Sequence, residues 1–168
     1  MDPLGGGPQV GEALRSSVDL VLAFGSDFVA FLALTAVAAV FAFYFGRDRL
    51  TALIAGILAA VPLYTYFPFV SMLGANPWLH IGLYLAFVIV GLVAFMGLSN
   101  WVPSTGVGFV KTLGLAAIAG GLLLAVALNL LPIADIYTVS EPTRALFSAQ
   151  YLFWWIAAGL GGVLLLGR

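Results

Sequence analysis

The chain has no cysteine, a single histidine and few charged side chains, and these scarcities exclude several classes of function. Without cysteine, disulfides, thiolate metal sites and cysteine nucleophiles are impossible. His80 is the only histidine, so one chain cannot build a multi-histidine metal cluster. We therefore predict neither a metal site nor a bound cofactor.

Charge is scarce as well. Charged residues make up 8% of the 168 residues, whereas an ordinary soluble domain contains roughly 25%. The net charge of −1 gives no electrostatic basis for binding nucleic acid. Hydrophobic residues make up 63% of the chain, so the polar surface that a soluble protein needs is missing and hydrocarbon is the natural solvent. We expect the lipid bilayer as a partner and no nucleic acid.

These proportions predict an all-α, polytopic helical membrane protein. Residues 1–9 are rich in glycine and proline and are predicted to form a flexible tail. Residues 10–168 are predicted to form one membrane domain. Within it, residues 10–24 place apolar residues at helical spacing opposite charged ones, which predicts an amphipathic helix in the membrane interface. The alternative for this segment is a solvated extension of the first spanning helix.

Five long apolar stretches follow. At 1.5 Å per residue, about 20 residues cross a hydrocarbon layer of about 30 Å. Glycine, proline and charged residues separate the stretches, so each is predicted to be one transmembrane helix. The predicted spans are 28–45, 50–73, 78–98, 109–131 and 144–166.

Basic residues near the helix ends predict the orientation, because lysine and arginine are retained on the cytoplasmic side. If the turn at 46–49 is cytoplasmic, four basic residues lie inside and two, Arg15 and Arg144, lie outside. We therefore expect an external N-terminus and a cytoplasmic C-terminus, in a bacterial or archaeal plasma membrane. The turn itself, Arg47-Asp48-Arg49, is predicted to fix this topology, with Asp48 as a cap. Its alternative partners are anionic lipid headgroups or a cytoplasmic protein.

Small residues recur four positions apart on three of the predicted spans. In a bilayer, helices associate through close backbone approach, which glycine and alanine allow. Such pairs either pack the bundle internally or form an interface with a second copy or another membrane subunit. The glycines in these pairs are Gly56, Gly120, Gly121, Gly161 and Gly162.

A few polar residues are candidates for chemistry. Asp27 precedes the first span, where it is either a helix cap or a buried carboxylate that binds a proton or cation. Asn129 is predicted to hydrogen-bond across helices. Tyr64 and Tyr66 either line a polar crevice or satisfy local backbone groups. Pro62 predicts a kink near Leu58, as a static feature or as a hinge.

The leading functional hypothesis is a non-enzymatic membrane subunit or scaffold, which acts through helix packing in a homo-oligomer or larger membrane complex. The alternative is a small-solute or ion transporter that uses Asp27, Pro62 and Asn129. A weaker alternative is a lipid-handling membrane enzyme that uses His80 with Asp135 or Glu141. Asp27→Asn separates the first two, because a capping residue tolerates the change and an ion ligand does not.

Overall fold

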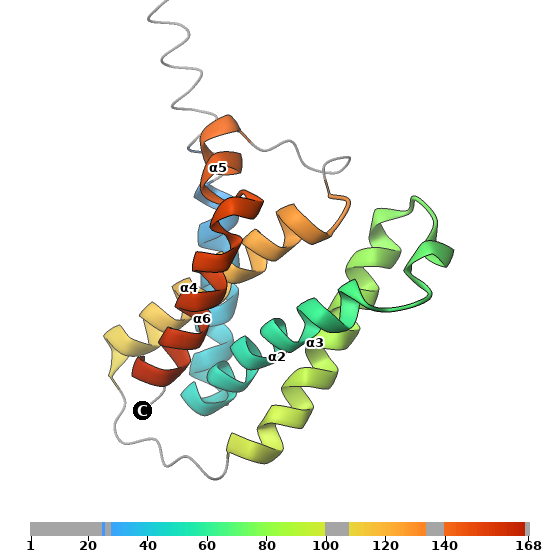
Figure 1. Ribbon diagram of the computed structural model, residues 1–168. Helices are drawn as coiled ribbons and strands as arrows, with labels where there is room; N and C mark the ends of the chain where they lie inside the picture. The colour runs from blue at the N-terminus through green and yellow to red at the C-terminus, as the bar shows by residue number, and fades with distance from the viewer. Residues whose placement is uncertain (1–24, 26–27, 100–107, 134–139, 167–168) are drawn as a thin grey trace, which may run out of the picture.

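The computed structural model describes residue 25 and residues 28–99, 108–133 and 140–166 (Figure 1). Every regular element in this part of the chain is a helix, which confirms the all-α prediction. The predicted tail at 1–9, the predicted amphipathic segment at 10–24, and the candidates Asp27 and Asp135 lie outside the described residues.

Four of the described helices are long and apolar enough to cross a membrane. The third and fourth coincide with predicted spans to within one residue at either end, and the first ends at Phe45, as predicted. These four helices are Phe28–Phe45, α2 (Arg47–Thr65), α3 (Pro77–Ser99) and α4 (Phe109–Leu130). Asn76 caps α3, because its Oδ1 accepts a hydrogen bond of 3.1 Å from the backbone N–H of Trp78, and Pro77 occupies the first helical position.

The turn between the first two helices is tighter than the predicted 46–49. α2 begins at Arg47, directly after Gly46, whose φ of 92° favours glycine. Arg47, Asp48 and Arg49 therefore form the first turn of α2. Asp48 is not the cap: Gly46 holds that position, without a side-chain capping bond. As an acidic residue in the first turn, Asp48 still interacts favourably with the helix dipole.

The second span is shorter than the predicted 50–73, because α2 ends at Thr65. Pro68 disfavours helical backbone at Phe67, and the helix tightens there, with the Phe67 N–H donating to the Tyr64 carbonyl at 3.3 Å. A short 3-10 helix, η1 (Val70–Leu73), then leads to α3.

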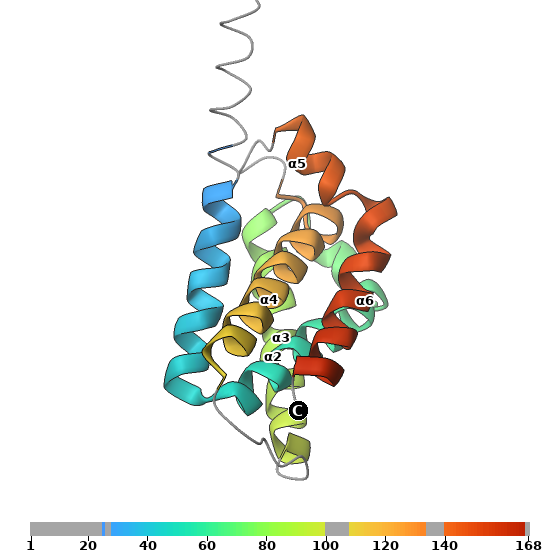
Figure 2. The same cartoon turned by 90° about the vertical axis from the view of Figure 1, so that its left-hand side faces the viewer.

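The predicted fifth span at 144–166 is broken into two helices, α5 (Glu141–Leu146) and α6 (Ala149–Leu166). The 18 residues of α6 extend about 27 Å, slightly less than the hydrocarbon thickness. The apolar stretch of α6, Ala149–Leu165, is one residue shorter than the Phe28–Phe45 helix, and α6 is not among the four helices that are long and apolar enough to cross a membrane. It nevertheless runs alongside α4 through the bundle (Figure 2).

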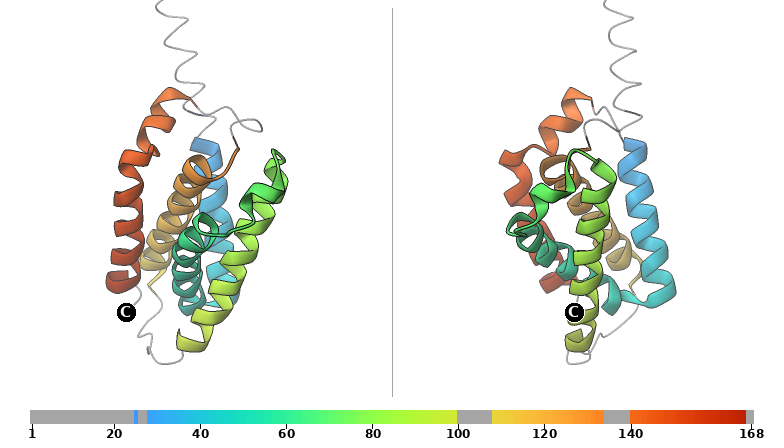
Figure 3. Two further views of the ribbon diagram at one scale, coloured as in Figure 1. Left: turned by 45° about the vertical axis from the view of Figure 1, so that its right-hand side comes forward. Right: turned by 90° about the vertical axis from the view of Figure 1, so that its right-hand side faces the viewer.

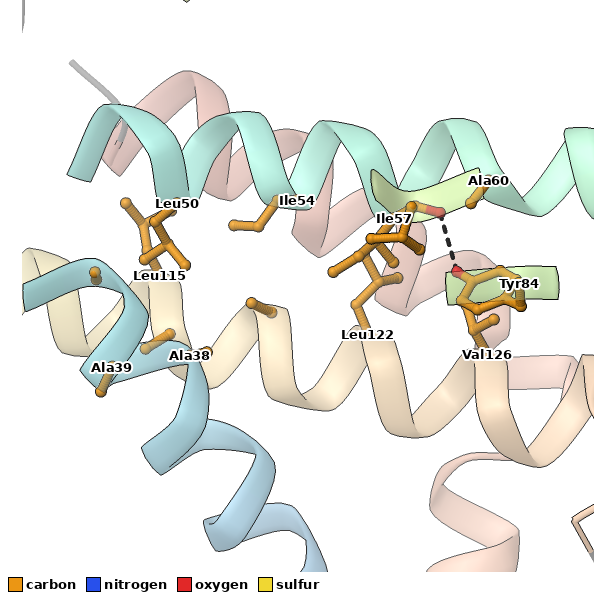
Figure 4. Close-up of a cluster of buried hydrophobic side chains, with 14 of the residues drawn as sticks. Ala38, Ala39, Leu50, Ile54, Ile57, Ala60, Tyr84, Leu115, Leu122 and Val126 are labelled. Atoms are coloured by element: carbon orange, nitrogen blue, oxygen red, sulfur yellow. Dashed lines mark hydrogen bonds between the residues drawn. The ribbon is translucent and has the colours of Figure 1, made fainter. Parts of the chain in front are cut away.

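The helices form a bundle in which α2 occupies the middle. The Phe28–Phe45 helix, α4 and α6 lie on one side of α2, and α3 lies on the other side (Figure 3). The large side chains with no exposed surface come from α2 and α4 and face one another (Figure 4). They are Leu50, Ile54, Ile57, Leu115, Leu122 and Val126.

The outer surface of the bundle is apolar. Large side chains such as Val37, Val40, Ile89 and Val93 are more than half exposed. A continuous exposed apolar surface of this kind promotes aggregation in water, whereas hydrocarbon solvates it without cost. The described helices thus have the surface of a membrane-embedded bundle.

Candidate functional site

The most extended polar contact in the described structure joins α2, α3 and the connection between them. Tyr64, near the end of α2, places its hydroxyl 2.7 Å from Nδ1 of His80, which lies in the first turns of α3. The other ring nitrogen of His80, Nε2, lies 3.0 Å from the carbonyl oxygen of Gly74. Both side chains are buried. Three segments are therefore tied together at one end of the bundle.

The hydrogen positions in this set of contacts follow from the Gly74 carbonyl, which can only accept. In a neutral imidazole Nε2 must then carry the hydrogen, and Nδ1 accepts from the Tyr64 hydroxyl. Both nitrogens of His80 are thus occupied by structural bonds. Gly74 has a φ of 64°, a backbone conformation that favours glycine. The His80 imidazole stabilises this turn through its bond to the Gly74 carbonyl.

A second tyrosine secures the same pair of helices one turn further along. The Tyr84 hydroxyl donates to the Ile57 carbonyl at 3.1 Å (Figure 4). The Tyr84 ring meets that of Tyr64 edge to face, with a centroid distance of 6.0 Å. Pro62 lies inside α2, as the sequence indicates, and cannot donate to the Leu58 carbonyl. Tyr84 thus reinforces α2 beside the position that proline weakens.

Asn129 holds the break between α5 and α6. Its Nδ2 donates to the Ala125 carbonyl at 2.7 Å, one turn earlier in α4, and to the Phe147 carbonyl at 2.5 Å. In a continuous helix, Phe147 would receive the Tyr151 N–H, but that N–H donates to Ser148 instead. The break leaves the Phe147 carbonyl without its helical donor, and the Asn129 side chain donates a hydrogen bond in its place.

Trp155 completes the same joint. Its indole N–H lies 3.4 Å from the Leu146 carbonyl, and its ring stacks on that of Phe147 with a centroid distance of 4.9 Å. Gly121 makes room for this ring, because a Cβ at that position would overlap the ring carbons of Trp155. The broken helix is therefore fixed to α4 by hydrogen bonds and by ring packing.

Two glycine contacts bring helix backbones together. A Cβ on Gly56 would lie 2.8 Å from the backbone nitrogen of Leu92, and a Cβ on Gly91 would lie 2.8 Å from the Cα of Gly56. α2 and α3 thus cross with glycine against glycine. Gly120 packs in the same way against the backbone of Thr35, in the Phe28–Phe45 helix.

Of the two remaining glycines predicted to pack, one lies against another helix and the other does not. Gly162 lies against α4, where a Cβ on it would lie 2.8 Å from Cδ1 of Ile118. Gly161 has no atom within 4 Å of a Cβ built on it, so nothing in the described chain packs there. Four of the five glycines thus lie at contacts within the chain, and Gly161 lies open.

Of the polar residues named as candidates for a transport path, the described ones lie at different contacts, and Asp27 is outside the described residues. Tyr64 belongs to the α2–α3 contact, whereas Asn129 belongs to the joint between α4 and the broken helix. Tyr66 is 84% exposed. Among the described residues, no group of three or more histidine, aspartate and glutamate side chains is close enough to hold a metal ion.

Sequence reasoning missed several residues that build these contacts. It identifies Gly56 from its spacing but not Gly91, whose neighbours four positions away on either side are phenylalanines. It identifies Asn129 but not its neighbours Phe147 and Trp155. The only signal for the break is Ser148, a weak helix former within an apolar run.

Comparisons of the chain with protein families, curated proteins and solved structures give no match.

Proposed function

We propose that this protein is a non-enzymatic integral membrane subunit, which acts through the outer faces of its helices in a homo-oligomer or a larger membrane complex. The observation that carries the proposal is the surface of α3. This helix packs mainly on α2 and lies at the edge of the bundle (Figure 3). Within the described part of the chain, its remaining surface is open to another membrane helix.

α3 has two narrow faces suited to helix packing, on opposite sides. The inner face meets α2 and consists of the buried residues Tyr84, Val88 and Gly91. An outer stripe follows the same helical spacing and is exposed along its whole length. We call it the α3 outer stripe; it consists of Gly82, Ala86, Ile89, Val93 and Gly97.

The composition of the α3 outer stripe favours a protein partner. Gly82 and Gly97 have no atom within 4 Å of a built Cβ, so a second helix backbone could approach closely at both positions. Ile89 and Val93 lie between them and offer rigid branched side chains for packing. Helices in a bilayer associate through this combination of small residues and van der Waals contact. Gly161 of α6 provides a further open position.

The proposal includes an orientation. Three of the four described basic side chains, Arg47, Arg49 and Lys111, belong to the end of the bundle opposite α5, and Arg144 lies in α5 (Figure 2). The tendency of basic residues to stay inside supports a cytoplasmic location for the first end. The N-terminus is then external and the C-terminus cytoplasmic, and a bacterial or archaeal plasma membrane is the proposed location.

Single cysteine variants test the proposal directly, because the chain has no thiol of its own. Ile89→Cys places a thiol on the α3 outer stripe, and Val37→Cys places one at a similarly exposed position of the Phe28–Phe45 helix. After oxidation in the native membrane, Ile89→Cys is expected to form a disulfide-linked dimer. Val37→Cys is the matched control and is expected to remain monomeric. If the partner is a different subunit, a photoreactive residue at position 89 is expected to crosslink to that subunit on illumination.

The proposal fails if position 89 gives neither a dimer nor a crosslinked partner, or if both positions crosslink equally as a result of random collision. The transporter alternative has weaker support. Tyr64 and Asn129 are already engaged in bonds that hold the bundle together, and they belong to different helix contacts.

A further inference from the structure

The α2–α3 connection, residues 66–76, carries no charge and exposes large apolar side chains. The sequence contains no aspartate, glutamate, lysine or arginine from residue 50 to residue 110. Tyr66 and Met72 are 84% and 78% exposed, and Phe69 is about half exposed. An exposed apolar patch of this kind marks an interaction surface, and its position in the bundle indicates what covers it.

The α2–α3 connection lies beside the first turns of α3 instead of extending far beyond them (Figure 1). The Phe67 ring contacts the Phe87 ring, with a centroid distance of 5.5 Å. Phe87 lies ten residues after Pro77, which is about 15 Å along the axis of α3. The Gly74 carbonyl is bonded to His80, in the first turns of the same helix. The connection is therefore held at the depth of the end of α3.

Several backbone groups of the connection are hydrogen-bonded within it. The Val70 N–H donates to the Phe67 carbonyl at 3.3 Å. The Met72 N–H donates to the Phe69 carbonyl at 3.0 Å. Pro68 has no N–H that would need an acceptor. Backbone donors that are paired inside a segment enter an apolar environment at a lower cost than unpaired ones. The connection can therefore approach hydrocarbon with these donors satisfied.

Two exposed rings of this region combine an apolar body with a polar tip. Tyr66 carries a hydroxyl and Trp78 an indole N–H, and both side chains are more than half exposed. Such rings are enriched at the boundary between lipid headgroups and acyl chains. Leu85, two turns after Trp78 on the same side of α3, is also exposed, so the apolar patch continues along the bundle. A bilayer that covers this side of α3 reaches the connection as well.

α5, at the same end of the bundle, has the opposite character (Figure 1). It carries Glu141 and Arg144, and both side chains are exposed. Charged side chains are costly in hydrocarbon and stay in water or among the headgroups. The charged α5 and the uncharged α2–α3 connection therefore belong at different depths in the membrane.

We propose that the α2–α3 connection inserts into the lipid surface at the boundary between headgroups and hydrocarbon, with Tyr66, Phe69 and Met72 in contact with acyl chains. The connection thereby anchors this end of α2 and α3 at a fixed depth. The partner is the lipid bilayer itself, and the contact requires no particular headgroup charge. This inference rests on the membrane location in the proposed function, but not on the subunit role or on the α3 outer stripe.

Nitroxide labels on single cysteines measure the depth of each position, because the chain has no thiol of its own. The full-length protein is reconstituted in phosphatidylcholine vesicles. Electron paramagnetic resonance then compares how often the label collides with oxygen, which partitions into lipid, and with a nickel chelate, which stays in water. Met72→Cys is the test position, and Tyr66→Cys provides an independent second reading.

Two further positions supply the references. Val37→Cys, near the middle of the Phe28–Phe45 helix, is exposed on the side of the bundle and serves as the lipid reference. Glu141→Cys, in the first turn of α5, serves as the water reference. We expect the label at position 72 to collide more with oxygen than with nickel. Its depth should lie between those of the two references, about 5–10 Å below the headgroup boundary.

Two results at position 72 overturn the inference. A label that collides with nickel as often as the label at position 141 places the connection in water. A label shielded from both oxygen and nickel is covered by protein, such as a second copy or another subunit. The lipid reference separates this inference from the proposed function: water at position 37 would refute both, whereas lipid at position 37 with water at position 72 would refute the anchor alone.

Discussion

Gly91→Ala tests whether the glycine contact between α2 and α3 determines the stability of the bundle. The added Cβ would lie 2.8 Å from the Cα of Gly56 and 3.1 Å from its carbonyl oxygen. Both are backbone atoms, so no flexible side chain can move aside. The two helices would have to separate, which weakens the Tyr84–Ile57 and Tyr64–His80 hydrogen bonds on the same face of α3.

The magnitude follows from a comparison with Gly82→Ala. Both glycines lie inside α3, so the gain in helix propensity from alanine is the same, at about 1 kcal/mol or less. Gly82 has nothing within 4 Å of its built Cβ, so the change adds no clash there. The difference between the variants is therefore the packing cost, which for overpacking of one methyl group is about 1–3 kcal/mol.

The assay is reversible unfolding in detergent micelles, with helix content measured as a denaturing detergent is titrated in. It is performed at a low ratio of protein to micelles, so that contacts between copies at Gly82 do not contribute. We expect a lower free energy of unfolding for Gly91→Ala than for Gly82→Ala by about 1–3 kcal/mol. Values that agree within about 0.5 kcal/mol would refute the close crossing of α2 and α3.

Three further predictions concern the polar and aromatic contacts. Asn129→Leu removes the donor to the Phe147 carbonyl and should lower the free energy of unfolding by about 1 kcal/mol, with faster hydrogen exchange in α5; unchanged exchange would contradict the role of Asn129 at the break. Tyr64→Phe and His80→Leu should show a coupling energy of about 0.5–1.5 kcal/mol in a double-mutant cycle, whereas additive effects would mean that the two side chains do not interact. Gly121→Ala should displace the Trp155 ring and change its emission in a variant with Trp155 as the sole tryptophan, and an unchanged spectrum would disprove the contact.

The sequence is informative about helices because hydropathy is a property of each segment taken alone. Residues 28–45 contain no charge, and Gly46 follows, so the C-terminal end of the first helix can be predicted. α3 and α4 are equally clear. The predicted second span is too long because Phe67, Phe69 and Val70 are apolar enough to extend a hydropathy run, although Pro68 disfavours helical backbone at Phe67.

The polar contacts are less predictable, because one sequence shows which residues can hydrogen-bond but not which neighbours they reach. Asn129 is correctly predicted to bond across helices, yet its partner lies 18 residues away at a break that no proline marks. The weaker enzyme alternative requires Asp135 or Glu141 beside His80, and nothing in the sequence points to Tyr64 and Gly74, to which the His80 ring nitrogens bond. Choosing among such partners requires knowledge of how the helices cross in space.

Composition and hydropathy are enough to predict the helices: a chain with 63% hydrophobic residues and long uncharged runs can satisfy its backbone polar groups in hydrocarbon only within helices, and four of the described helices are long and apolar enough to cross a membrane. Which small residues are buried and which stay open depends instead on how the helices cross. Gly91 meets Gly56 because α2 and α3 cross there, while Gly82 and Gly161 meet nothing within 4 Å. In lipid, apolar faces are equally well solvated, so hydropathy cannot distinguish a packed face from an open one, and only the fit between helix surfaces can.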